Sequence, residues 1–196
     1  MPNGIYNLGL QDIPPDFPYS IGIHPNDIGS GSTEDLFSWL EANIRENCFA
    51  IGECGLDSGA TADLKTQGEA FLRQLRIAEE IRKPVIIHCV RKFYEVISFR
   101  KYTSQPMIMH GFNKKQKVAA DLLDNNFYLS FGKAVLYNLS LQDTLKAVPL
   151  HRIFLETDDE DFDIGILYEK VSVLRGISLK SLNEQIRENL ETIKNG

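Results

Sequence analysis

The chain has 196 residues, of which 43% are hydrophobic, and a formal net charge of −6 at pH 7. This length and apolar content allow one sizeable core and a single compact domain over residues 1–196, and they exclude a disordered, collagen-like or disulfide-stapled chain. The negative charge argues against a protein that coats nucleic acid by bulk electrostatics, although a hydrolase can still bind phosphate groups locally.

The cysteines and the apolar runs bear on the cellular compartment. Cys48, Cys54 and Cys89 are an odd set at irregular spacing, so neither a disulfide framework nor a cysteine-rich zinc site is expected. Apolar runs such as 85–87 are much shorter than a membrane span, and no basic segment followed by an apolar stretch opens the chain. We therefore expect a soluble, cytoplasmic protein without a membrane partner.

Short apolar runs predict seven strands. In chain order they cover residues 5–8, 19–24, 49–53, 84–88, 106–110, 127–131 and 152–156. Their cores are continuous rather than alternating, a pattern typical of strands buried on both faces of a parallel sheet.

Amphipathic segments predict helices between and after these strands. They cover residues 33–47, 66–82, 91–99, 114–125, 141–148, 165–175 and 179–193. Ser32 or Thr33 can cap the first, and Gly176 and Ser178 separate the last two. Alternating strands and helices indicate right-handed βαβ units in a barrel or an open sheet. Because no GxGxxG or GxxxxGK[ST] follows a strand, we favour an α/β fold of the TIM-type barrel class.

Residues suited to metal binding stand at the predicted strand ends. Four runs end in His24, Glu53, His88 and His110, and Asp158 follows the last run. The carboxyl ends of barrel strands converge on one face, where active sites lie. A histidine at a strand end is often only structural, but its recurrence at several half-buried ends favours function.

Imidazole nitrogens and carboxylate oxygens from separate strands suit a divalent cation such as Mg²⁺, Mn²⁺ or Zn²⁺. We expect Glu53, His88, His110 and Asp158 to converge on one or two such ions. A metal held in this way lowers the pKa of bound water and neutralises phosphate charge, and Asp158 is the natural proton acceptor.

Basic residues follow several of the same strands. They are Arg91, Lys92, Lys114, Lys115, Lys117 and Lys133. Any single lysine fits a solvated helix face equally well, but as a group they suit a phosphate backbone. We therefore predict that Arg91 and Lys114 bind the substrate, and that the substrate is DNA or another phosphodiester.

Six strings in order carry a family resemblance. They read Ile-Gly-Ile-His-Pro at 21–25, Ala-Ile-Gly-Glu-Cys-Gly-Leu-Asp at 50–57, Lys-Pro-Val-Ile-Ile-His-Cys at 83–89, His-Gly-Phe at 110–112, Phe-Tyr-Leu-Ser-Phe-Gly at 127–132 and Leu-Glu-Thr-Asp at 155–158. From about residue 19 onward the sequence resembles the TatD family of metal-dependent deoxyribonucleases.

The resemblance implies a TIM-like barrel, one or two divalent cations and hydrolysis of DNA, often from the 3′ end. Carried over to this sequence, Glu53 would be a catalytic carboxylate that bridges the metals, and His88 and His110 would bind one ion. Asp158 would be both a ligand and the catalytic proton acceptor. His24 would lie beside the site or near a substrate phosphate.

One family feature is missing. Family members open with a strand that ends in a His-x-His pair, and none of the four histidines here forms such a pair. We therefore expect seven barrel strands, weakened metal binding, and either a monomer or a dimer that covers the exposed strand edges. Two other functions stay open: an amidohydrolase-like enzyme acting on a small substrate, and a catalytically impaired or metal-free homologue with a binding role.

Overall fold

The computed structural model describes residues 4–29, 31–158 and 160–194. Within these residues, seven parallel strands follow one another in the sheet in chain order. They are β1 (Tyr6–Leu8), β2 (Tyr19–Ile21), β3 (Cys48–Asp57), β4 (Val85–Val90), β5 (Met107–Met109), β6 (Phe127–Phe131) and β7 (Ile153–Leu155). The predicted α/β fold with seven parallel strands is confirmed.

Helices separate most of the strands and close the chain. They are α1 (Thr33–Ala42), α2 (Leu64–Ile81), α3 (Phe93–Ser98), α4 (Gln116–Asp124), α5 (Leu139–Ala147), α6 (Ile164–Arg175) and α7 (Leu179–Lys194). Ser32 caps α1 through the N–H of Asp35, and Gly176 ends α6 with a φ of 63°, both as predicted. Among the described residues, every helix is too short or too polar to cross a lipid bilayer.

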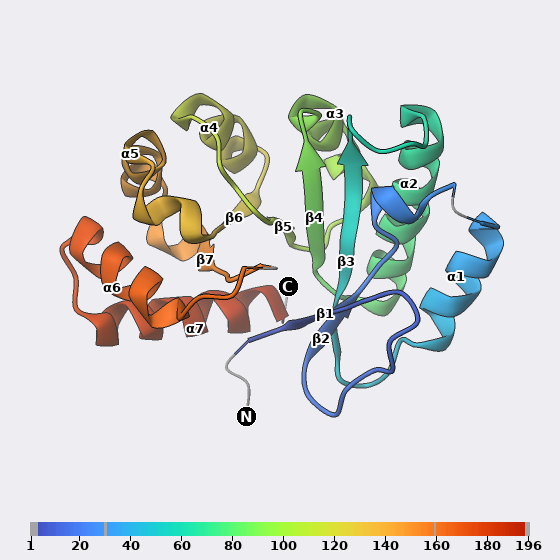
Figure 1. Ribbon diagram of the computed structural model, residues 1–196, viewed down its shortest axis with the longest axis horizontal. Helices are drawn as coiled ribbons and strands as arrows, with labels where there is room; N and C mark the ends of the chain where they lie inside the picture. Colours follow the sequence, from blue (N-terminus) through green and yellow to red (C-terminus); the bar gives the residue numbers. More distant parts are fainter. Residues whose placement is uncertain (1–3, 30, 159, 195–196) are drawn as a thin grey trace. The chain divides into compact units, whose positions relative to one another are not determined.

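The chain divides into two compact units, the first ending at Met107 and the second beginning at Ile108. In the first unit α2 lies along β3 (Figure 1). Ile51, Phe71 and Leu75 are completely buried. Burial along nearly all of β3 agrees with the continuous pattern read from the sequence. The single domain over residues 1–196 stays a prediction.

In the second unit, a buried amide fixes α7 against the start of β7. Asn189 is 2% exposed, and its Nδ2 donates to the carbonyl oxygens of Leu150 and Ile153 at 2.8 and 2.9 Å. Buried polar groups are stable only when they are hydrogen-bonded, so this pair of contacts specifies one position for the helix. These hydrogen bonds fix the start of β7, the strand that precedes Asp158 in the chain.

Strand β3 is longer than predicted. Its register against β4 shifts between Ile51 and Cys54, so Gly52 and Glu53 together oppose Ile86 in a β-bulge. Gly52 has a φ of 143°, and a Cβ there would lie 2.3 Å from the carbonyl oxygen of Ile86, so the bulge requires glycine. The prediction that this strand ends at Glu53 is therefore wrong, because the chain passes through the bulge and continues pairing.

Candidate metal site and family

Three predicted site residues meet in the first unit. His24 follows β2 by three residues, Glu53 lies in the bulge of β3, and His88 lies inside β4. The predictions that the runs end in His24 and His88 are wrong, because β2 stops earlier and β4 continues further. Nevertheless, one possible ligand atom from each residue lies within 4.8 Å of the other two.

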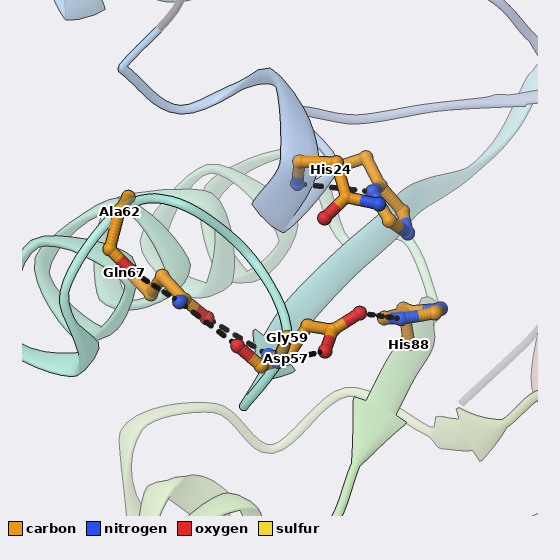
Figure 2. Close-up of polar contacts among 7 residues, drawn as sticks. His24, Asp57, Gly59, Ala62, Gln67 and His88 are labelled. Atoms are coloured by element: carbon orange, nitrogen blue, oxygen red, sulfur yellow. Dashed lines mark hydrogen bonds and ion pairs between the residues drawn. The ribbon is translucent and has the colours of Figure 1, made fainter.

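The donor set of this group fits a divalent cation. Glu53 offers a carboxylate oxygen and His88 an imidazole nitrogen, and all three side chains of the group are half-buried. The rings of His24 and His88 approach edge to face, with centroids 4.2 Å apart (Figure 2). Such a mixed nitrogen and oxygen set is suited to Zn²⁺, Mn²⁺ or a similar ion.

His24 has a further chemical property that follows from its first hydrogen bond. Its Nδ1 accepts the backbone N–H of Asn26 at 3.1 Å, which caps the short 3₁₀-helix at Pro25–Asp27. Because Nδ1 uses its lone pair as an acceptor, the proton of the neutral imidazole lies on Nε2. His24 therefore offers a hydrogen-bond donor to an anion more readily than a second lone pair to a metal.

Two glutamines of α2 hold the backbone beside the site. Gln74 accepts the N–H of Ile23 at 2.7 Å and donates to its carbonyl at 3.1 Å, directly before His24. Gln67 accepts the N–H of Asp57 at 2.8 Å and donates to its carbonyl at 3.0 Å (Figure 2). Both glutamines are 1% exposed and stand seven positions apart, on one face of the helix. Helix α2 thus fixes the backbone beside the site at two points, directly before His24 and at Asp57.

Asp57 is a site neighbour that the sequence reasoning missed. Its Oδ2 lies 3.0 Å from His88 Nε2, and its Oδ1 accepts the N–H of Gly59 at 2.6 Å (Figure 2). Burial alone would raise the pKa of Asp57, but the bond from Gly59, the bond to His88 and the nearby histidine charges outweigh it and lower the pKa. The available signal was an acidic residue that ends a buried strand.

The second unit holds the other two predicted ligands. His110 follows β5 directly, and one possible ligand atom of His110 lies within 4.8 Å of one of Asp158. His110 Nδ1 is 3.6 Å from Glu156 Oε1, which also accepts the N–H of Gly111 at 2.6 Å. Asp158 has a φ of 53°, a left-handed conformation that aspartate adopts more readily than most residues.

The four predicted ligands are divided between the two units. Glu53 and His88 belong to the first, and His110 and Asp158 belong to the second. Their convergence on one point therefore stays a prediction. Glu156, which contacts His110, is not predicted as a site residue, because its position two residues before Asp158 gives no information about its partner.

The predicted phosphate contacts differ in their surroundings. Arg91 is exposed directly after β4, and Lys114 is exposed in the segment before α4. Both stay predictions. Lys133 is instead paired with Glu160 at 2.8 Å, and this contact raises the pKa of Lys133. Lys133 is therefore a weaker candidate for binding a substrate phosphate than the sequence suggested.

Comparison with known proteins gives relatives along nearly the whole chain. The uncharacterized metal-dependent hydrolase YcfH of Escherichia coli K12 is 27% identical over 190 residues, which cover 87% of this chain and 71% of YcfH. The uncharacterized metal-dependent hydrolase YabD of Bacillus subtilis is 36% identical over 151 residues, which cover 73% of this chain and 59% of YabD.

A solved structure shows the same fold. The crystal structure of YJJV, a TatD homolog from E. coli, matches with a TM-score of 0.81 at 20% identity, over 91% of this chain and 77% of that one. The predicted TIM-type barrel fold of the TatD kind is thereby confirmed. The profile of the TatD-related DNase family matches residues 10–195. The chain therefore belongs to the TatD-related DNase family, as a metal-dependent hydrolase.

Proposed function

We propose that the protein is a metal-dependent deoxyribonuclease that hydrolyses phosphodiester bonds. The observation that carries this proposal is the approach of Glu53 and His88, whose possible ligand atoms lie within 4.8 Å of each other, with an atom of His24 equally close. A carboxylate oxygen and an imidazole nitrogen at this separation are donors that a divalent cation binds.

Glu53 and His88 are the proposed ligands in the first unit, and His110 and Asp158 are those in the second. A bound Mg²⁺, Mn²⁺ or Zn²⁺ supplies Lewis-acid stabilisation of phosphate charge and lowers the pKa of a water molecule. One or two ions per chain suit this number of ligands.

The other residues bind the substrate and move protons. His24 donates its Nε2–H to a phosphate oxygen, in accord with the hydrogen bond that occupies Nδ1. Asp158 accepts the proton of the water whose oxygen attacks phosphorus, while the bond from phosphorus to the leaving oxygen breaks. Arg91 and Lys114 each bind a phosphate of the substrate, and such contacts position a strand without reading its sequence.

The test is hydrolysis of a short DNA oligonucleotide, labelled at one end, by the purified chain after removal of metal. We expect cleavage only when Mg²⁺, Mn²⁺ or Zn²⁺ is added, and we expect Glu53→Gln and His88→Ala to abolish it. His151→Gln is the matched control, since His151 is exposed on a short 3₁₀-helix and should leave the rate unchanged. Cleavage that persists in a chelator, or that survives Glu53→Gln, would refute the proposal.

A further inference from the structure

The two ring nitrogens of His88 have different surroundings. Nε2 lies 3.0 Å from Oδ2 of Asp57, at the carboxyl end of β3 (Figure 2). An ionised carboxylate can only accept hydrogen bonds, so it stabilises the form of the neutral imidazole that carries its proton on Nε2. The lone pair of His88 is then on Nδ1.

Asp57 itself is held firmly in place. Its carboxylate accepts the N–H of Gly59 at 2.6 Å, and its backbone N–H and carbonyl are both bound by Gln67. Gln67 also donates to the carbonyl of Ala62 at 2.7 Å, which ties this network to the segment before α2 (Figure 2). The side chain of Asp57 is only 11% exposed. An aspartate whose carboxylate and backbone are both fixed by hydrogen bonds can orient a neighbouring ring.

We propose that Asp57 is a positioning residue that keeps the proton of His88 on Nε2 and so presents Nδ1 to the divalent cation. The inference rests on the proposed metal site at Glu53 and His88. A carboxylate on the far nitrogen of a ligand histidine fixes its orientation and increases the basicity of the ligand nitrogen. A purely structural Asp57 would instead stabilise the ends of β3 and β4 without any effect on the metal.

The first test needs no substitution in Asp57. The chain is labelled with ¹⁵N-histidine, loaded with Zn²⁺ and studied by NMR, and the His88 signals are assigned by their loss in His88→Gln. We expect the proton on Nε2 and the metal on Nδ1. A proton on Nδ1 would overturn the inference, whatever the activity of the protein.

The second test compares Zn²⁺ affinities in a competition titration with a chromogenic chelator. Asp57→Asn keeps the size of the side chain but removes its charge, and we expect Zn²⁺ to bind about 10- to 100-fold more weakly. Asp63→Asn is the matched control, because Asp63 caps α2 through the N–H of Thr66 and asparagine caps equally well. Affinity in Asp57→Asn equal to that of the wild type would overturn the inference.

The inference and the proposed function fail in different ways. Weaker Zn²⁺ binding in Asp57→Asn together with no DNA hydrolysis by the wild type would support the role of Asp57 and refute the nuclease. Metal-dependent hydrolysis with unchanged Zn²⁺ binding in Asp57→Asn would support the nuclease and refute the role of Asp57.

Discussion

Gln74 provides a quantitative test of how α2 supports the site. It is 1% exposed, and it satisfies both the N–H and the carbonyl of Ile23, at 2.7 and 3.1 Å. In Gln74→Leu these two backbone groups would stay buried without partners, at about 1–3 kcal/mol each. Burial of the apolar leucine side chain would offset about 1.5–3 kcal/mol of this loss in stability. The expected net loss is about 2 kcal/mol, which for a chain of this size lowers Tm by about 4–8 °C.

The assay is urea unfolding of the metal-free protein, with the midpoint and slope measured separately. Arg76→Leu is the control, because Arg76 is exposed on the same helix and its replacement should change stability by less than about 0.5 kcal/mol. Since Ile23 precedes His24, Gln74→Leu should also slow DNA hydrolysis. Equal free energies of unfolding for Gln74→Leu and Arg76→Leu would contradict the role of Gln74 in stabilising the backbone at Ile23.

Two further substitutions test the bulged strand and a charged surface contact. Gly55 has a φ of 146°, and a Cβ there would lie 2.1 Å from the carbonyl oxygen of His88, so Gly55→Ala should lose at least about 2 kcal/mol and weaken Zn²⁺ binding. Unfolding and Zn²⁺ titration measure both effects, and wild-type values would contradict the close approach of β3 and β4. Hydrogen bonds from the Thr103 and Ser104 hydroxyls and from the Ser104 N–H lower the pKa of Glu79 from 4.5 to about 2. The folded form therefore loses this stabilisation as the pH falls from 4.5 towards 2. Across this pH range, the free energy of unfolding should fall less for Glu79→Gln than for the wild type. An equal fall in both proteins would contradict the role of these hydrogen bonds.

The strand pattern of the fold could be read from the sequence because burial on both faces leaves a continuous apolar run. The run at 127–131 coincides with β6, where all five side chains are buried. Helix ends were predicted where a capping residue marks them, as at Ser32 and Gly176. Helix α2 begins at Leu64, two residues before the predicted start at residue 66, because Asp63 caps it.

The local geometry of the site could not be read in this way. The sequence contains Gly52 and Glu53, but the register that places them opposite Ile86 depends on pairing with a distant segment. For the same reason, the hydrogen bond between Asp57 and His88, 31 residues apart, leaves no local signal. Residue types therefore indicated which side chains could bind a metal, whereas the bulge and the buried glutamines decide how they are oriented.

The presence of a divalent-metal site built on Glu53 and His88 is the central claim, and calorimetric titration of the metal-free chain with Zn²⁺ tests it most directly. The wild type and His151→Gln should bind Zn²⁺ with the same affinity, while Glu53→Gln and His88→Gln should give no resolvable binding heat under the same conditions. Circular dichroism would confirm that each variant is folded. Equal Zn²⁺ binding by all four folded proteins, or none by the wild type, would contradict the claim.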